Sequence, residues 1–200
     1  MLFVKILFVA AAYLIGSINS AIIVGRLMGL GDIREKGSHN AGSTNMLRVG
    51  GKKAAAFTFS GDILKGIIVV AAAKIFREQI GNVALYLSCL AVIVGHNFPI
   101  FFGFRGGKGV ATSAAVMIIL DFPIGISIVL ISLAVMAISK YVSLGSIAGA
   151  VIYPIAVAIF RSEPEYTVFA VLVGLLALIR HRANIKRLIN GTENKLSKKG

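Results

Sequence analysis

The sequence predicts an all-α protein, a polytopic membrane bundle of seven transmembrane helices. Of its 200 residues, 57% are hydrophobic and only 14% are charged, and the mean hydropathy is +0.88. A soluble domain of this size needs more polar side chains to cover its surface. Apolar stretches of about 20 residues, roughly the length that crosses 30 Å of hydrocarbon, recur along the whole chain. We therefore expect one integral membrane domain over residues 1–200, with a polar tail from about 190 to 200.

Seven apolar segments are visible, at residues 2–24, 54–73, 83–102, 110–120, 122–138, 144–160 and 166–179. The first could be mistaken for a signal peptide, but only Lys5 precedes the alanines at 10–12 and the apolar run continues to Val24. We expect an uncleaved first span. The fourth and fifth segments are short, so they form either one bent span or two spans that turn at Asp121.

The distribution of charge favours seven spans, with the amino terminus outside and the carboxyl terminus inside. The outer side then carries few of the 21 lysines and arginines, namely Lys5, Lys74, Arg77 and Arg161. Lys65 lies within the second span, and all the others face the cytoplasm, as the positive-inside rule requires. This bias and anionic lipid explain the net charge of +13, although some cations can also hold anionic substrates. We expect no nucleic-acid partner, because no hydrophilic basic domain exists.

The first inner loop, residues 37–48, combines small residues with hydrogen-bonding ones. Its candidates for substrate binding are Ser38, Asn40, Thr44, Asn45 and Arg48. Small residues let the backbone turn tightly, and arginine offers a planar fork of donors. The loop therefore suits a phosphate or a polyol, although an ordinary polar loop is the simpler interpretation.

A second constellation joins the inner ends of the third and fourth spans. His96 and Asn97 precede it, and it ends in a glycine-rich run that contains Arg105, Gly106, Gly107 and Lys108. Backbone amides at a helix start, together with a lysine, form a good phosphate cradle. The run is not a Walker A loop, because the first glycine and the magnesium-binding Ser or Thr are missing.

Further polar residues are expected at the cytoplasmic ends of the spans. His181 and Asn184, three residues apart, would share a helical face after the last span. Ser143 and Ser146 begin the sixth span, where serine either caps the helix or contacts substrate. Asp62 and Lys65 are the only charges deep within a span, and they form either a structural ion pair or a functional one.

The sequence lacks the residues that several other kinds of active site require. The inner face has too few acids for a magnesium site and no His/Cys cluster for zinc, so we expect neither metal nor cofactor. No Ser-His-Asp arrangement suggests itself, and the single Cys89 excludes an internal disulfide. The acyl-CoA acyltransferase signature, a histidine followed five residues later by aspartate, is absent, because those positions hold Thr44, Phe101 and Lys186.

In combination, the loops resemble the bacterial acyl-phosphate:glycerol-3-phosphate acyltransferase (PlsY) family. The matching motifs are Gly-Ser-x-Asn-x-Gly-x-Thr-Asn at 37–45, Asp-x-x-Lys-Gly at 62–66, Gly-His-x-Phe-Pro with Phe-x-Gly-Gly-Lys-Gly-Val-Ala-Thr at 95–112, and Arg-His-Arg-x-Asn-Ile at 180–185. They cover most of the chain in order and spacing. The departures are His39 where glycine is usual, Ser43 for alanine and Arg105 for lysine.

The resemblance implies transfer of a fatty acyl group from acyl phosphate to the sn-1 hydroxyl of glycerol 3-phosphate, giving lysophosphatidic acid and phosphate. This is the first acylation of phospholipid biosynthesis, and it implies a multi-pass protein of the bacterial cytoplasmic (inner) membrane with its active site facing the cytoplasm. Implied partners are the two substrates, membrane lipids and the soluble enzyme that makes acyl phosphate. A transporter of a phosphorylated metabolite is the alternative, although it would place its site near mid-membrane between repeats.

On this interpretation the residue roles fall into two sets. The catalytic candidates are His96, His181, Asn184 and Lys108, and either histidine or a substrate phosphate oxygen accepts the hydroxyl proton. The glycerol 3-phosphate phosphate is expected on Ser38, Arg48, Lys108 and His181, with Asn184 orienting. The donor phosphate is expected on the Gly106 and Gly107 amides with Thr44 and Asn45, and the remaining substrate-binding candidates are Asn40, Arg105 and Ser143.

Overall fold

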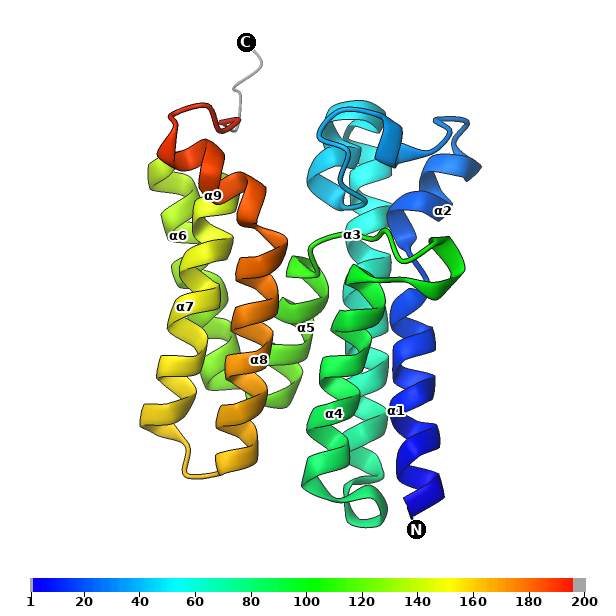
Figure 1. Cartoon of the computed structure of the whole chain (residues 1–200), viewed down its shortest axis with the longest axis vertical. Coiled ribbons are helices and arrows are strands. Elements are labelled where there is room, and N and C mark those ends of the chain that lie inside the picture. Colours follow the sequence, from blue (N-terminus) through cyan, green and yellow to red (C-terminus); the bar gives the residue numbers. More distant parts are fainter. Residues whose placement is uncertain (1, 196–200) are drawn as a thin grey trace. The chain divides into compact units, whose positions relative to one another are not determined.

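The computed structural model describes residues 2–195, and within that range it contains nine α-helices, two 3₁₀ helices and no strand. The predicted all-α class is confirmed. The chain divides into two compact units, one up to residue 119 and one from residue 120, and each is described by itself (Figure 1). The last five residues of the predicted polar tail lie outside the described residues.

The first predicted span consists of two helices, α1 (Leu2–Ser17) and α2 (Ser20–Leu27). The break follows from Asn19, whose side chain caps α2 by accepting a hydrogen bond from the Ile22 amide at 3.1 Å. Ending a helix inside an apolar run leaves backbone carbonyls without helical partners. Those carbonyls become part of the candidate site.

The rest of unit one is built from η1 (Ile33–Glu35), α3 (Ser43–Ile75), α4 (Arg77–Asn97), η2 (Ile100–Phe102) and the first residues of α5 (Val110–Leu120). α3 begins well before the predicted apolar segment, and it is interrupted at Gly51, whose φ of 74° is not helical. Its first turns therefore form a short separate helix that carries Thr44, Asn45 and Arg48. A glycine is needed at this break because a φ in the left-handed region costs other residues about 1–2 kcal/mol.

Close helix packing holds unit one together. α1 packs along α4 and α4 packs along α3. A Cβ on Gly16 would overlap the Val92 carbonyl of α4, and a Cβ on Gly95 would overlap the Tyr13 carbonyl of α1. Small residues at such crossings let two membrane helices approach closely, which replaces the hydrophobic driving force that lipid does not supply.

Unit two is a bundle of α6 (Phe122–Ser139), α7 (Val142–Phe160), α8 (Pro164–Arg180) and the short α9 (Arg182–Ile189). α7 packs against both α6 and α8. Asp121 caps α6 and also pairs with Arg161 at 2.6 Å, which ties the start of α6 to the end of α7. α9 lies at the same end of this unit as the start of α7 (Figure 1).

Each predicted apolar segment contains an α-helix, although the first is broken before Ser20 and α4 ends at Asn97, before the predicted end of the third segment. The number of membrane crossings does not follow from the number of helices. Five segments among the described residues are long and apolar enough to span a membrane, and the pair α8 and α9, bent by 60°, gives a sixth candidate. α5 has only 11 residues and is shorter than these. α5 and α6 are separate helices on either side of Asp121. Seven crossings and their orientation stay predictions.

Candidate functional site

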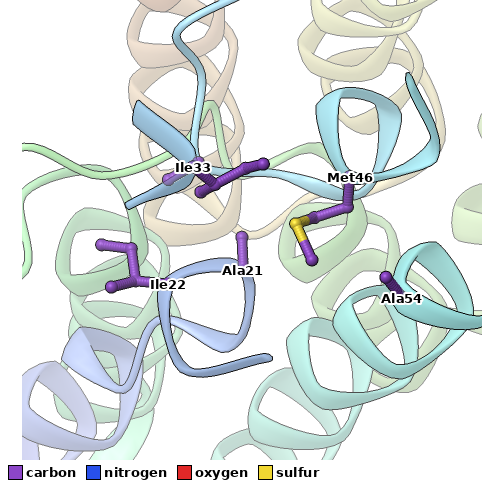
Figure 2. Close-up of a cluster of buried hydrophobic side chains, with 6 residues drawn as sticks. Ala21, Ile22, Ile33, Met46 and Ala54 are labelled. Carbon is purple, nitrogen blue, oxygen red and sulfur yellow. The ribbon is translucent and has the colours of Figure 1, made fainter. Parts of the chain in front are cut away.

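A small hydrophobic cluster anchors the first loop of unit one. Its fully buried members are Ala21, Ile22, Ile33, Ala41, Met46 and Ala54. Figure 2 draws these side chains as sticks, and the labelled ones come from α2, η1 and α3. Burial of these methyl groups holds the loop against the helices, so the polar residues between Ile33 and Met46 are displayed on a fixed backbone.

Asn45 shapes this loop from within. Its Nδ2 donates to the carbonyls of Ile33 at 3.1 Å and Lys36 at 2.9 Å, and its Oδ1 accepts from the Ser38 amide at 2.8 Å. Both amide hydrogens are therefore used inside the protein, and the side chain is 1% exposed. Its predicted contact with substrate stays a prediction, whereas its contribution to the shape of the loop is visible.

Arg34 joins the two predicted loops, and the motif analysis did not single it out. Its guanidinium donates to the carbonyls of Phe102 at 2.7 Å and Arg105 at 3.0 Å. Asp32 holds the same guanidinium at 2.6 Å, and these hydrogen bonds lower the pKa of Asp32 to about 2. The only sequence signal was an acid two residues before an arginine, which is too common to interpret.

The glycine-rich run lies directly beneath the first loop. A Cβ on Gly107 would overlap His96 Nε2 and the Ala41 carbonyl, so only glycine permits this approach. The amides of Gly106 and Gly107 donate to the carbonyls of Asn97 and His96, each at 3.2 Å. These bonds extend the end of α4 into the loop. The predicted phosphate contact of the two amides stays a prediction and would require these bonds to open.

His96 belongs to a buried group with Asp62 and Lys65, all from α3 and α4. Lys65 Nζ lies 3.1 Å from Asp62 Oδ1, so the predicted ion pair is present, and Asp62 Oδ1 lies 3.3 Å from His96 Nδ1. Lys65 also donates to the carbonyls of Gly16 and Ile18, at 3.1 and 3.0 Å, which the break before α2 leaves without helical partners.

The His96 ring lies against both members of the ion pair. Its Nδ1 lies 2.9 Å from Lys65 Nζ and 3.3 Å from Asp62 Oδ1, so this nitrogen is engaged inside the protein. Nε2 is the nitrogen that faces Gly107.

Asn97 is the most unusual residue near the glycine loop. Its side chain is completely buried, and neither its Nδ2 nor its Oδ1 has a hydrogen-bond partner. Buried amides are nearly always paired, because an unpaired polar group costs about 1–3 kcal/mol. Asn97 is not among the predicted site residues, although it adjoins His96 in the second constellation.

In unit two, His181 is buried, and Asn184 and Ser143 share one hydrogen-bond partner. His181 lies at the junction of α8 and α9, 2% exposed, and its Nδ1 donates to the Ala177 carbonyl at 2.8 Å. A carbonyl can only accept, so the neutral ring keeps its lone pair on Nε2. Asn184 Nδ2 and Ser143 Oγ both donate to Glu193 Oε1, at 2.7 and 3.0 Å.

The serines at the start of α7 do not cap that helix. Tyr141 occupies the cap position, Ser146 donates to the Val142 carbonyl, and Ser143 points to Glu193. Of the other predicted residues, Ser38, Arg48 and Arg105 are exposed, whereas Asn40, Thr44 and Lys108 are half-buried. Glu193 belongs to the few acidic residues expected at the inner face, and its sequence context did not indicate these contacts.

Unit one also has an apolar groove of about 480 Å³ between α2 and α3. It is lined by Ser20, Ile23, Val24, Leu27, Met28, Phe57 and Gly61. The lining is almost entirely hydrocarbon, so the groove suits a lipid chain rather than a polar ligand.

Comparison with known proteins identifies the family. The family model described as glycerol-3-phosphate acyltransferase matches residues 6–191, nearly the whole chain. The chain belongs to the glycerol-3-phosphate acyltransferase family. The Thermoanaerobacter pseudethanolicus protein of that name is 46% identical over 94% of this chain and 93% of its own, and the Clostridioides difficile protein is 42% identical over 99% and 98%.

Solved structures agree with this membership. The glycerol 3-phosphate form of PlsY (YgiH), an integral membrane glycerol 3-phosphate acyltransferase, superposes with a TM-score of 0.90 at 34% identity, covering 96% of both chains. The lysophosphatidic acid form of the same enzyme gives a TM-score of 0.87 at 33% identity. The family model and the relatives cover nearly the whole chain, so the predicted resemblance is confirmed.

Proposed function

We propose that this protein transfers a fatty acyl group from acyl phosphate to the sn-1 hydroxyl of glycerol 3-phosphate, releasing lysophosphatidic acid and inorganic phosphate. Membership of the family supports the acceptor, and solved relatives at 33–34% identity are described in glycerol 3-phosphate and lysophosphatidic acid forms. The donor is proposed from the residues. The observation that carries the proposal is the meeting of two small, basic loops at Ala41 and Gly107.

The two loops suit phosphate chemistry. Arg48, Lys108 and Ser38 supply charge and donors on a backbone that the hydrophobic cluster and the Arg34 contacts hold in place. An acyl phosphate is already activated and has a good leaving group. Catalysis can therefore rest on positioning and on neutralising the phosphate charge, with no covalent intermediate on the protein.

Hydrogen bonding favours one histidine over the other as proton acceptor. His96 Nδ1 is already engaged by Lys65 and Asp62, whereas His181 donates from Nδ1 to a carbonyl and so keeps the lone pair of its neutral ring on Nε2. We assign proton acceptance to His181 Nε2 or to a phosphate oxygen of the substrate. His96 and Lys108 are assigned to stabilising negative charge, and Asn184 to orienting the acceptor.

The acyl chain and the membrane complete the proposal. The apolar groove between α2 and α3 gives the fatty chain a lipid-like environment. We keep the seven-crossing arrangement of a single membrane domain in the cytoplasmic membrane, with the amino terminus outside and the loops inside, because this arrangement places most lysines and arginines in the cytoplasm. A soluble enzyme that makes acyl phosphate is the expected supplier of the donor.

The test is made in proteoliposomes that contain the purified protein, acyl phosphate and labelled glycerol 3-phosphate. We expect labelled lysophosphatidic acid together with an equal amount of inorganic phosphate. A transporter would instead accumulate unmodified glycerol 3-phosphate inside the vesicles. Uptake without lysophosphatidic acid would overturn the proposal.

A further inference from the structure

Glu193 lies on the segment that follows α9 and reaches two of the predicted site residues. Its side chain is only 6% exposed. One carboxylate oxygen, Oε1, accepts from Ser143 at 3.0 Å and from Asn184 at 2.7 Å. The other, Oε2, accepts from Arg187 Nε at 2.7 Å. A single acid therefore joins α7, α9 and the end of the described chain.

The carboxylate is charged at neutral pH. Burial by itself would raise the pKa of Glu193, but the hydrogen bonds from Asn184, Arg187 and Ser143 outweigh it and hold that pKa below its ordinary value. An ionised carboxylate has no hydrogen and can only accept. Each group that contacts it must therefore present a hydrogen to it.

This requirement fixes the polarity of both neighbours. Asn184 must turn its NH₂ group toward Glu193, so its remaining polar atom, Oδ1, is an acceptor. Ser143 has a single hydroxyl hydrogen, and that hydrogen is committed to Glu193, so Ser143 meets any further partner as an acceptor. Without the carboxylate, either side chain could turn around and donate.

We propose that Glu193 is a positioning residue that makes Ser143 and Asn184 hydrogen-bond acceptors for the hydroxyl groups of the glycerol moiety. The inference rests on the proposed function and specifies how the glycerol 3-phosphate site recognises its substrate. Hydroxyl groups carry hydrogens that such acceptors bind, whereas a phosphate dianion carries none and is disfavoured there. The pair is therefore matched to the polyol end of glycerol 3-phosphate and not to its phosphate.

The competing interpretation is that Glu193 only fastens the end of the chain to Arg187. Such a fastening would change stability, and activity would follow stability for every substrate alike. If Glu193 instead sets the hydrogen-bond direction of Ser143 and Asn184, its loss would change recognition of glycerol 3-phosphate alone. The two interpretations therefore differ in which Michaelis constant moves.

The first variant is Glu193→Gln, which keeps the size of the side chain but lets an NH₂ group face Ser143 and Asn184. We expect the KM for glycerol 3-phosphate to rise about tenfold, since one charge-assisted hydrogen bond is misdirected. The KM for acyl phosphate should change less than twofold, and the melting temperature should stay near that of the wild type. Lys186→Ala, at an exposed position of α9, is the control and should behave as wild type in all three measurements.

The acceptor analogue dihydroxyacetone phosphate gives a second measurement, because it has a carbonyl oxygen where glycerol 3-phosphate has the C2 hydroxyl. A site built to accept from a hydroxyl rejects an analogue that lacks it. We expect the wild type to prefer glycerol 3-phosphate and Glu193→Gln to reduce that preference about tenfold. An unchanged preference together with an unchanged KM would overturn the assignment, as would an equal rise in both KM values accompanied by a fall in melting temperature.

A swap of the two groups keeps the proposal testable even if Glu193→Gln folds poorly. Asn184→Asp alone places two carboxylates against each other and should lose most turnover. Combined with Glu193→Gln, it restores an amide–carboxylate pair and again leaves an acceptor oxygen at position 184. We expect the turnover of the double variant to recover at least tenfold over Asn184→Asp, and no recovery would contradict the proposal.

These experiments also distinguish the proposal from the proposed function. Wild-type protein that makes no lysophosphatidic acid would count against the proposed function. Normal wild-type turnover with unaltered kinetics of Glu193→Gln would overturn only the role of Glu193.

Discussion

Arg48 and Lys108 are the two cations of unit one that we assign to substrate phosphate. In a partly desolvated site each makes a charge-assisted contact of about 1.5–3 kcal/mol. Changing either to alanine should lower kcat/KM by about 10- to 150-fold, because about 1.4 kcal/mol corresponds to tenfold. Arg48→Lys should recover only part of the loss, since lysine keeps the charge but not the bidentate fork.

Steady-state kinetics on detergent-purified variants, with melting temperatures in parallel, would check this prediction. Lys53→Ala and Lys186→Ala are the controls, because both side chains are exposed basic residues outside the predicted site. Near-wild-type kinetics for both Arg48→Ala and Lys108→Ala would mean that phosphate binds elsewhere.

His39 has a backbone conformation that is strained for a residue with a side chain. Its φ is 57°, in the left-handed region, and its Nδ1 lies 3.1 Å from the Arg34 carbonyl. Glycine adopts this backbone without strain, whereas a residue with a side chain pays about 1 kcal/mol. His39→Gly and His39→Ala both remove the imidazole, so their difference isolates the backbone. We expect the glycine variant to be more stable by about 1 kcal/mol in thermal or chemical unfolding, and equal stability would contradict the strain argument.

Some residue roles could be predicted from the sequence, and others could not. The small, polar and basic residues of both loops can be interpreted from the sequence as a phosphate-binding set, because their types and spacing carry that chemistry locally, and that role stays a prediction. The tasks of Asn45, Arg34 and Glu193 were not, because they depend on partners that only folding brings near. Asn45, for instance, looks like a substrate ligand in the motif but uses both amide hydrogens inside the loop.

At the scale of elements, the break between α1 and α2 depends on Lys65 of α3. The lysine satisfies two carbonyls that the break leaves open and balances the buried Asp62. Lys65→Met should destabilise the protein by about 3–5 kcal/mol, because it leaves an uncompensated buried charge. Lys65→Met combined with Asp62→Asn should recover a large part of that loss, since no buried charge then remains.

Unfolding in detergent measures both effects in one double-mutant cycle. Additive losses in the double variant, without any recovery, would show that the two residues do not act as an ion pair. The cycle also separates the effect of the ion pair from the effect of the unbonded carbonyls. Both variants lack the lysine that bonds to the carbonyls of Gly16 and Ile18, so that loss is the same in each.

The helices themselves were largely predictable, because apolar segments near 20 residues have one stable form in lipid. α5 occupies the predicted 110–120, and α6, α7 and α8 each extend one to two residues beyond the predicted ends. The break at Asn19 was not predictable, since the apolar run continues through it and only the capping contact ends α1. The early start of α3 was not predictable either, because its first turns lie in a polar stretch that precedes the apolar segment beginning at residue 54.

At the scale of the whole chain, the membrane class and the family followed from composition and from four motifs in order. The number of crossings did not follow, because α5 is short and the pair α8 and α9 is bent. Orientation also depends on the membrane, which the distribution of lysines and arginines can indicate but the helices alone cannot. Cysteine labelling from either side at the exposed positions Arg105 and Gly191 tests it: both should be reached from the cytoplasm, and opposite sides would overturn the proposed topology.

The central claim is that acyl phosphate, and not acyl-CoA, supplies the acyl group without a metal ion. The measurement is lysophosphatidic acid formed by purified protein from glycerol 3-phosphate with each donor in turn, with and without EDTA. We predict turnover with acyl phosphate that EDTA does not reduce, and no turnover with acyl-CoA, because the histidine–aspartate signature of acyl-CoA enzymes is absent from the sequence. Robust turnover with acyl-CoA, or activity that EDTA abolishes and magnesium restores, would contradict the account.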